Sequence, residues 1–393
     1  MKNSLLICYK AILAIILSIS GASSATINVP VDQPTIQAGI DAAVNGDIVI
    51  VADGIYTGDG NRDIDFLGKA IVVMTENGPD YTEIDCEGSE TEPHRGFYFQ
   101  NSESASSELI GFKIHNGYHD HGGAIRIESS SPAISNCNLN NNTATDMTYS
   151  GGAISLNNST STISNCVINF NTAIGGGGLF FWESDATLIN CIVTNNIANP
   201  GGGGGIHCHG GNPEIVNCTF ANNDGGGWGG GIDYYTGAPT IQNCIVYNNS
   251  ADNGSGIWCG TSGAIISCSN LYLNGISGRS HSEINCFSSD PLFIDANNGD
   301  YRLIYNSPCL PDNNECQLLI GALIGTYGCG DVNDDSEIDI LDIVSLINYK
   351  YKGGIAPDPL ESADVNHDTN VDILDIVHLI NFKYKGGDEP DCP

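Results

Sequence analysis

The stretch that decides the fold is GGGIHCHGGNPEIVNCTFANN, from Gly203 to Asn223. Its first part has the form Gly-Gly-x-aliphatic, and its second part has the form aliphatic-x-Asn-Cys-x-apolar. The first form occurs six times, once as GSGI, and its aliphatic residues follow one another at intervals of 29, 25, 27, 26 and 25 residues from Ile125 to Ile257. The second form returns in phase with it as ISNCNL, ISNCVI, LINCIV, IVNCTF and IQNCIV. Two motifs that keep one phase in this way define a structural repeat.

A repeat of about 26 residues, with short alternating strands and Gly or Asn at its corners, predicts one rung of a parallel β-solenoid with three strands per rung. Side chains alternate along each strand, so Ile206 and Cys208 are predicted to point inward. By the same alternation His207 and His209 are predicted to point outward. The same phase is predicted to bury four further side chains, Ile232, Tyr234, Ile257 and Cys259.

Each second motif carries an Asn and a Cys whose roles we predict to be structural. Asn tolerates the left-handed conformation of a sharp bend and can hydrogen-bond the Asn of the next rung. Buried Cys packs as a small apolar side chain, so stacked thiols need not form disulfides. The predicted Asn column is Asn136, Asn165, Asn190, Asn217 and Asn243, and the predicted Cys column is Cys137, Cys166, Cys191, Cys218, Cys244 and Cys268.

Charge and hydropathy exclude several classes of protein. The formal charge of −33 repels nucleic acid and anionic membranes, so we expect no nucleic-acid partner. At the start of the chain, an apolar stretch over 11–19 follows two lysines and precedes small residues, which predicts a secretory signal peptide over 1–25. No later stretch approaches about 18 unbroken apolar residues, so we expect no membrane insertion. The mature chain is predicted to be secreted.

A second repeat begins after Cys329, where the Gly and Asn corners stop and helical periodicity starts. The segment DVNDDSEIDILDIVSLINYKYKGG at Asp331 returns as DVNHDTNVDILDIVHLINFKYKGG at Asp364. Each copy has oxygen-bearing side chains at loop positions 1, 3, 5, 9 and 12 and a backbone carbonyl at position 7, the spacing of a calcium-binding EF-hand loop. The predicted ligands of two Ca²⁺ ions are Asp331, Asn333, Asp335, Glu337, Asp339 and Asp342, then Asp364, Asn366, Asp368, Asn370, Asp372 and Asp375. Clustered carboxylates repel one another, so folding here is predicted to be coupled to calcium.

Each calcium loop is followed by one helix and preceded by none, unlike a complete EF-hand. This loop–helix duplication resembles a type I dockerin, from Gly330 to about Asp388. Ser336 and Thr369 depart from the Gly that is usual at loop position 6, which bears on calcium affinity. The resemblance implies a cohesin-domain partner, bound by exposed aliphatic side chains at loop positions 10 and 11, namely Ile340, Leu341, Ile373 and Leu374. Because the copies are nearly identical, two binding orientations are expected.

The repeats before this module resemble the right-handed parallel β-helix group, which includes pectin lyase-like proteins and the repeats of polymorphic membrane proteins. The segment from Thr26 resembles the strand and short helix that cap such a coil, and SDPLFIDANNGDYRLIYNSPCL, 289–310, resembles its closing rungs. The predicted fold is therefore mainly β: one right-handed parallel β-helix over 26–328, followed by a small all-α calcium-binding dockerin over 329–393, with repeats at 331–354 and 364–387. Two disulfides are hypothesised, Cys329–Cys392 and Cys309–Cys316.

The outward positions after each glycine run form a candidate site. They carry aromatic, acidic and imidazole side chains, which suit stacking on sugar rings and hydrogen bonding to hydroxyls. The candidate substrate-binding residues are Arg126, Trp182, His209, Tyr235 and Trp258. Glycosidic hydrolysis needs two carboxylates. The candidate catalytic residues are Asp233 and Glu183, two rungs apart, with His207 beside Asp233.

Two functions remain open at this stage, because the catalytic motifs of the related polysaccharide-acting families are missing from the coil. In the first, the dockerin attaches a secreted bacterial protein, through calcium-dependent cohesin docking, to an extracellular or cell-surface polysaccharide-degrading assembly. The coil then binds or cleaves the O-glycosidic bonds of a polysaccharide, as a hydrolase or a lyase. In the second, the coil is a noncatalytic adhesin-like or structural rod that the same dockerin displays.

Overall fold

The computed structural model of this 393-residue chain describes residues 24–146, 150–261, 263–304, 306–322, 329–333, 338–357, 360–368, 370–388, 390 and 392. Almost all of the predicted signal peptide, and the predicted calcium ligands Asp335 and Glu337, lie outside these residues. The described residues form two compact units. The coil unit comprises those within 22–290 and 314–323, and the helical unit comprises those within 291–313 and 324–393.

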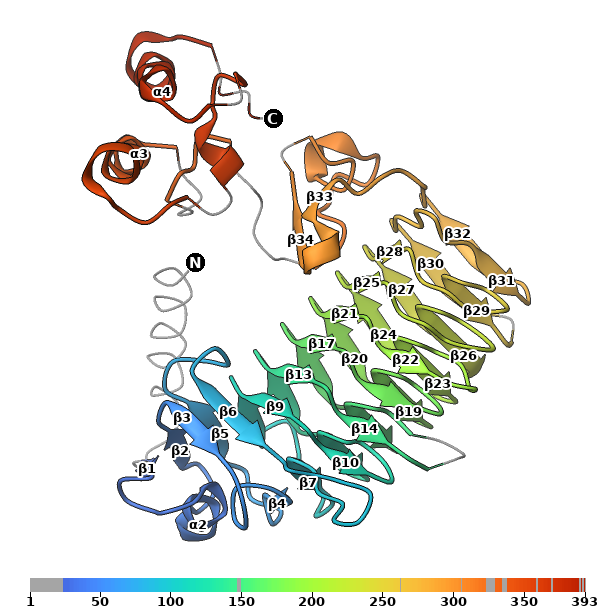
Figure 1. The fold of residues 1–393 in the computed structure, drawn as a ribbon. Coiled ribbons are helices and arrows are strands. Elements are labelled where there is room, and N and C mark those ends of the chain that lie inside the picture. The colour runs from blue at the N-terminus through green and yellow to red at the C-terminus, as the bar shows by residue number, and fades with distance from the viewer. Residues whose placement is uncertain are drawn as a thin grey trace. The chain divides into compact units, whose positions relative to one another are not determined.

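The coil unit consists of parallel strands stacked rung upon rung (Figure 1). Sheet A contains β1 (Thr26–Val29), β2 (Ile48–Val51), β5 (Val72–Thr75), β8 (Glu108–Ile110), β12 (Ala133–Ser135), β16 (Thr162–Ser164), β20 (Thr187–Ile189), β24 (Glu214–Val216), β27 (Thr240–Gln242), β30 (Ile265–Ser267) and β32 (Ser282–Ile284). Sheet B contains β3 (Gly54–Tyr56), β6 (Thr82–Asp85), β9 (Lys113–His115), β13 (Asn138–Asn140), β17 (Val167–Asn169), β21 (Ile192–Thr194), β25 (Thr219–Ala221) and β28 (Ile245–Tyr247).

Two further sheets complete the coil. Sheet C contains β4 (Ile64–Asp65), β7 (Phe97–Phe99), β11 (Ile125–Glu128), β15 (Ile154–Asn157), β19 (Leu179–Trp182), β23 (Ile206–His209), β26 (Ile232–Thr236), β29 (Ile257–Cys259) and β31 (Ile276–Gly278). The short sheet D contains β10 (Tyr118–His119), β14 (Thr143–Ala144), β18 (Thr172–Ala173) and β22 (Ile197–Ala198). Three long sheets confirm the predicted rung of three strands.

Alternation along the strands sets the core as predicted. Ile206 and Tyr234 are fully buried and Cys208 is 1% exposed. His207 and His209 lie on the outer side of the same strand and are half-buried. The pattern holds because one aliphatic residue of each rung stacks on that of the next, as Ile206 does on Ile232.

The predicted Asn column occupies left-handed bends. Its five members have φ between +51° and +59°. Asn190 Nδ2 donates to Asn165 Oδ1 at 2.5 Å, and Asn243 Nδ2 donates to Asn217 Oδ1 at 3.2 Å. These hydrogen bonds between rungs confirm the structural role of the corner asparagines.

A second Asn column, inside the coil, was not predicted as a column. Its members are Asn142, Asn171, Asn196, Asn223, Asn249 and Asn274. Within it, Asn196 Oδ1 accepts both the backbone N–H and the side-chain N–H of Asn171, at 3.0 and 2.9 Å. Asn196 Nδ2 donates to Ile168 O at 2.9 Å. Each rung therefore satisfies the buried amide groups of the rung before it.

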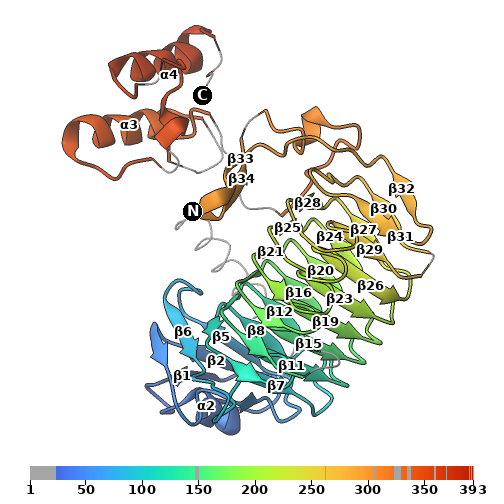
Figure 2. The same ribbon diagram turned by 45° about the vertical axis from the view of Figure 1, so that its right-hand side comes forward.

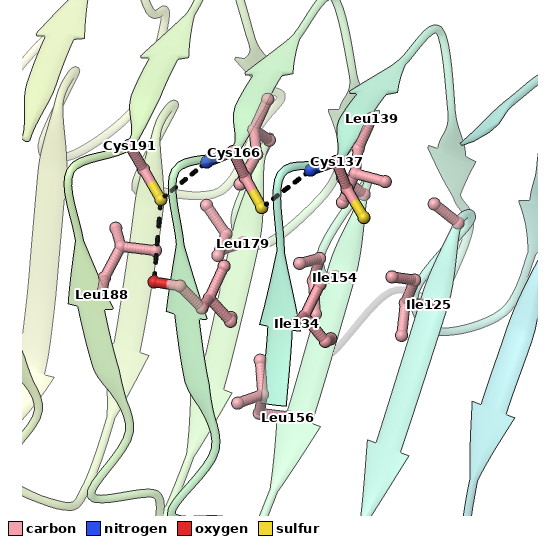
Figure 3. Close-up of a cluster of buried hydrophobic side chains, with 14 of the residues drawn as sticks. Ile125, Ile134, Cys137, Leu139, Ile154, Leu156, Cys166, Leu179, Leu188 and Cys191 are labelled. Carbon is pink, nitrogen blue, oxygen red and sulfur yellow. Dashed lines mark hydrogen bonds between the residues drawn. The ribbon is translucent and has the colours of Figure 1, made fainter. Parts of the chain in front are cut away.

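The thiol column also links successive rungs (Figure 3). Cys137 N–H donates to Cys166 Sγ at 3.4 Å, and Cys166 N–H donates to Cys191 Sγ at 3.5 Å. Burial raises the pKa of the Cys191 and Cys218 thiols well above the ordinary value, so both stay protonated. The prediction of a column of free thiols is confirmed for its first five members.

The sixth predicted member, Cys268, was placed wrongly. It has φ +47° and occupies the corner position, while Ser269 takes the column position and accepts Cys244 N–H at 3.1 Å. Cys268 is bonded to Cys316, so the hypothesised Cys309–Cys316 pair is also wrong, and Cys309 is buried and not part of a disulfide. This disulfide holds the segment 314–322 against the coil.

Helix α2 (Ile36–Ala42) closes the first end of the coil beside β1 and β2 (Figure 2). Thr35 caps it by accepting Ala38 N–H at 3.2 Å. Ile36 and Ile40 are fully buried. Gly39 lies so close to the strands that an added Cβ would approach Val49 to 2.9 Å. The predicted strand and short helix at this end are confirmed.

The helical unit contains α3 (Ile340–Lys352), α4 (Ile373–Lys385), η1 (Ala296–Asn298), η2 (Pro311–Asn313), η3 (Leu360–Ala363), β33 (Phe293–Asp295) and β34 (Asp300–Leu303). Strands β33 and β34 pair antiparallel, so residues 291–303 form a hairpin and not the closing rungs expected from the sequence. Ile294 and Ile304 pack against the core of α3 and α4. The predicted Cys329–Cys392 disulfide is confirmed. No helix within the described ranges has the length and apolarity to cross a membrane.

Candidate functional site

The outer side of sheet C carries the residues predicted to bind a ligand. In the register of the sheet, Phe180 lies beside His207, His207 beside Asp233, and Asp233 beside Trp258. Two residues further along the strands, Trp182 lies beside His209. Adjacent positions are one strand spacing apart, about 4.8 Å, so side chains of successive rungs are in contact.

Three rings of this face stack on one another. Trp182 and His209 have ring centroids 4.3 Å apart and planes inclined by 7°, and His209 and Tyr235 have centroids 5.1 Å apart and planes inclined by 22°. We call Trp182, His209 and Tyr235 the ring ladder. Its inner ring faces are covered by neighbouring rings, so only the two end rings, Trp182 and Tyr235, can offer a face to a ligand. His209 is the inner ring of the ladder, so both of its faces are covered by neighbouring rings.

Tyr235 reaches the ladder through a β-bulge in β26. The register pairs Cys208 with Tyr234 but His209 with Thr236, which leaves Tyr235 as an extra residue. Strict alternation along the two strands would instead have paired Tyr235 directly with His209. The bulge leaves the Tyr235 side chain 57% exposed while its ring still stacks on His209.

A pocket of about 680 Å³ opens at the Tyr235 end of the ladder. It brings together four predicted site residues, His207, Asp233, Tyr235 and Trp258. Its other lining residues include Trp228, Gly202, Gly260, Gly278 and Arg279. Trp228 and Arg279 were not predicted as site residues. Arg279 follows the last strand of sheet C, where the glycine motif no longer marks the phase.

Asp233 and His207 form the polar floor of this pocket. The side chain of Asp233 is 4% exposed, and its Oδ2 lies 2.7 Å from His207 Nδ1. The approach does not meet hydrogen-bond geometry, and both His207 Nδ1 and Asp233 Oδ1 are buried without a hydrogen-bond partner among the described residues. A nearly enclosed carboxyl group with an unsatisfied oxygen is costly unless a ligand or a proton compensates it.

Glu183 does not join this pocket. It stands in a left-handed bend after β19, and its carboxyl group lies where a Cβ on Gly210 would be, 2.6 Å from Cδ. Asp233 instead faces Gly202, whose added Cβ would lie 2.4 Å from Oδ2. The two carboxyl groups therefore lie toward opposite ends of the strands. The structure does not bring together the two carboxylates that hydrolysis would need.

A smaller pocket of about 280 Å³ lies at the Trp182 end of the ladder and is lined by Arg126, Phe180 and Trp182. Arg126 is engaged elsewhere, since it forms an ion pair with Glu128 at 3.0 Å and lies over the Tyr98 ring at 5.3 Å.

Asp120 belongs to a charged cluster beside this smaller pocket. It pairs with Arg95 at 2.9 Å and contacts His119. Although burial acts against it, hydrogen bonds from His121 N–H and His119 and the charges of His119 and Arg95 lower the pKa of Asp120 to about 2.

The two loops of the helical unit bury carboxylates. Asp342 and Asp375 are fully buried, and Asp331 and Asp364 are 8% and 3% exposed. Asp342 is satisfied by the amides of Val332, Asn333 and Asp339. Loop positions 1 and 12 are thus drawn together in both copies.

The second loop provides a test of the predicted calcium site. Asp375 Oδ2 accepts Asp372 N–H at 2.7 Å, but for the buried Oδ1 no partner among the described residues meets hydrogen-bond geometry. Burial raises the pKa of Asp375, and the charges of Asp364 and Asp368 raise it further, against the backbone amides of Asp372 and Asn366. A buried carboxylate oxygen that faces two other carboxylates fits a cation.

Other predicted ligands have protein partners in this structure. Asp368 N–H donates to Asp364 Oδ1 and to Asn366 Oδ1, both at 3.0 Å. Asp339 and Asp372 cap the N-termini of α3 and α4, each forming a capping box with the Asp three residues later. This role was not predicted, although the spacing Asp-x-x-Asp indicates it. Within the described ranges, no group of three or more His, Cys, Asp or Glu is already arranged around a metal position.

Both helices begin with exposed aliphatic side chains. Ile340 and Leu341 are 49% and 52% exposed, and Ile373 and Leu374 are 50% and 54% exposed. Val344 and Val377 extend the two strips by one helical turn. The near equality of the copies gives the unit two equivalent apolar surfaces.

Comparisons with known proteins agree with this architecture. Residues 95–272 match the family described as right handed beta helix region, and residues 329–382 match the family described as dockerin type I domain. No curated protein matches the chain. Among solved structures, the crystal structure of pectate lyase Pel9A is similar, with 13% sequence identity over 75% of this chain and 92% of that chain and a TM-score of 0.48. The chain is a right-handed β-helix protein with a C-terminal type I dockerin domain.

Proposed function

We propose that this is a secreted glycan-binding protein, attached by its dockerin to a cohesin-bearing extracellular assembly that degrades polysaccharides. The observation that carries the coil's part in this proposal is the larger pocket of sheet C. Tyr235, Trp228 and Trp258 supply aromatic surface, while Asp233, His207 and Arg279 supply hydrogen-bonding groups. Apolar ring faces beside a few convergent polar groups are what a sugar requires.

Docking would use the two aliphatic strips of α3 and α4. Calcium, bound by the oxygens of the two loops, would fix the start of each helix and hence the strip that follows it. In the second loop the ion would be held by Asp364, Asn366, Asp368, the Asn370 carbonyl, Asp372 and Asp375. The first loop offers the equivalent six positions, from Asp331 to Asp342.

The glycan-binding half of the proposal is tested by isothermal titration calorimetry. The purified full chain is titrated with a panel of pectic, cellulosic, xylan and mannan polysaccharides. We expect binding to one class and its loss in the double variant Trp228→Ala/Trp258→Ala. Phe170→Ala is the matched control, because Phe170 is an exposed aromatic residue outside the pocket. Absence of binding to every polysaccharide would reject this half.

Cleavage is a second candidate function, supported by the buried Asp233–His207 pair. Asp233 is the one carboxylate among the described lining residues of the pocket, so a hydrolysis that uses two carboxylates is not supported. In a cleavage reaction His207 would act as the proton-transferring group, and Asp233 would stabilise the positive charge of the protonated imidazole. The test is an assay of reducing ends and unsaturated products with each bound polysaccharide. If the native protein forms product and Asp233→Asn does not, cleavage is supported. If the native protein binds a polysaccharide without forming product, only the binding function is supported.

The docking half is tested with a type I cohesin on a sensor surface. Substitution of either Ile340 and Leu341 or Ile373 and Leu374 by Asp should leave binding largely intact, because the other copy remains. Substitution of all four should abolish it. Complete loss from one pair would contradict the two orientations. Docking without any glycan binding would favour an adhesin-like or structural rod.

A further inference from the structure

We infer that the larger pocket accepts one sugar ring as the next step of the ring ladder, stacked on Tyr235 above Gly260. This inference rests on the proposed glycan binding and specifies its mode. The protein would then recognise a single sugar residue, such as the end or a branch of a chain, and not an extended chain laid along sheet C.

The first observation is the register beyond the ladder. Trp182, His209 and Tyr235 occupy successive steps, and the next position of this column is Gly260, which follows β29. Gly260 has no side chain. The register pairs Cys259 with Gly278, so the position after Gly260 is Arg279. The one empty step leaves about 10 Å, two strand spacings, between the levels of Tyr235 and Arg279.

The second observation explains why this step stays empty. The bulge at Tyr235 brings its backbone toward Gly260, where an added Cβ would lie 2.5 Å from Tyr235 O. The same bulge therefore exposes one face of Tyr235 and excludes a side chain from the position opposite it. Bulges commonly redirect side chains at functional sites in this way.

The third observation is the chemistry around the slot. Trp258 of β29 lies two residues before Gly260 and forms one wall of the slot. Asp233 and His207 are its register neighbours on the two preceding rungs. Asp233 Oδ1 is buried and unsatisfied, so it can accept a hydroxyl hydrogen bond. Arg279 also lines this pocket. A ring with an apolar face and polar edges matches these groups, as a pyranose does.

The other end of the ladder offers no comparable slot. Trp182 has Asn157 as its register neighbour on the preceding rung, so that step of the column carries a side chain. The pocket there is less than half as large, about 280 Å³ against about 680 Å³, and its arginine is already paired with Glu128. The ladder therefore has one open end, at Tyr235.

The test uses the polysaccharide that binds in the panel above, cut into oligosaccharides from a single sugar to chains that would span sheet C. We expect affinity for the full chain to reach a plateau within the shortest oligomers. We expect Tyr235→Ala to weaken binding about tenfold, the loss of one aromatic stacking contact, and Tyr235→Phe to restore it. Phe170→Ala, which removes a ring of the same exposure, 56% against 57%, should change nothing.

Three outcomes would overturn the inference while leaving glycan binding in place. They are affinity that grows with every added sugar across the sheet, unchanged binding in Tyr235→Ala, and a loss in Trp182→Ala that exceeds the loss in Tyr235→Ala. Failure of every polysaccharide to bind would instead reject the proposed function and the inference with it. Thermal unfolding of each variant shows whether the coil is intact, which the exposure of Tyr235 leads us to expect.

Discussion

The coil unit and the helical unit both bury polar side chains in repeated positions, but they satisfy them in opposite ways. In the coil, Asn196 makes hydrogen bonds to the rungs on both sides, so the repeat itself satisfies the buried amides. In the helical unit, Asp375 is equally buried, and among the described residues its Oδ1 has no partner that meets hydrogen-bond geometry. The repeated Asn column of the coil is therefore satisfied by the chain itself, whereas the repeated acidic loops of the helical unit leave a place for a ligand.

Removal of calcium should have the largest effect on stability, and this effect should be confined to the helical unit. With a chelator, we expect the unfolding transition of the helical unit to disappear, because its buried carboxylates lose the cation that offsets their repulsion. The transition of the coil should stay in place. Calorimetry with and without chelator, followed by restoration of calcium, measures both. A helical unit that unfolds identically in both conditions would contradict the comparison.

Asn196→Ala should give the next largest effect, in the coil alone. The substitution leaves at least two buried donors of Asn171 without an acceptor, at about 1–3 kcal/mol each, so we expect a loss of about 3 kcal/mol in the free energy of unfolding. Thr172→Ala, at an exposed neighbouring position, is the control. Chemical denaturation of both variants gives the difference. A loss below about 1 kcal/mol would mean that water replaces the Asn196 amide in the inner Asn column.

We propose that the helical unit includes the hairpin of 291–303, which precedes the residues that match the dockerin family. Substitutions in the apolar contact of this segment test that boundary. The double variant Ile294→Ala/Ile304→Ala removes two half-buried side chains from its core, and we expect a loss of about 2 kcal/mol in the calcium-loaded helical unit. Ile355→Ala, at a side chain that is 95% exposed, should cost nothing. Thermal unfolding distinguishes the units. A shift in the coil transition instead would assign the hairpin to the coil.

Asp120 should give the smallest effect, and one that depends on pH. Its pKa is lowered to about 2 in the folded chain from 3.8, so it stabilises the coil above pH 3.8 and this stabilisation is lost as the pH falls toward 2. The carboxyl group is half exposed, so screening limits the contribution to under about 1 kcal/mol. Asp120→Asn should flatten the acid limb of the coil's stability curve without changing the helical unit. An unchanged limb would show that other carboxyl groups account for it.

The sequence predicted most features that follow from the repeat and missed the places where one rung departs from it. The inward phase of Ile206 and Cys208 and the left-handed corners at Asn136 and its equivalents follow from period and residue type alone. The inner Asn column was also legible, since an Asn stands five residues after each Cys, as Asn196 does after Cys191. Cys268 was misplaced because its motif, Ser-Cys-Ser, is shifted by one residue, and composition does not reveal a shift.

The candidate site was predictable in its residues but not in its arrangement. Asp233, His207 and Trp258 could be placed on one face by counting, and they do line one pocket. The bulge at Tyr235 adds a residue that strict alternation cannot register, and it decides which ring face is free. Glu183 fails because a left-handed bend after β19 turns its side chain toward Gly210, a local conformation that spacing does not encode.

The Cys268–Cys316 disulfide has a mechanical consequence. Tension that reaches the coil from residues beyond 322 first meets Gly321 N–H on Asn243 O and Ala322 N–H on Thr219 Oγ1, and then the disulfide. The covalent bond passes a load that arrives along residues 317–322 directly to Cys268, so the last rungs, within 269–290, lie outside this path of the force. A pull along this segment would thus leave the final rungs in place.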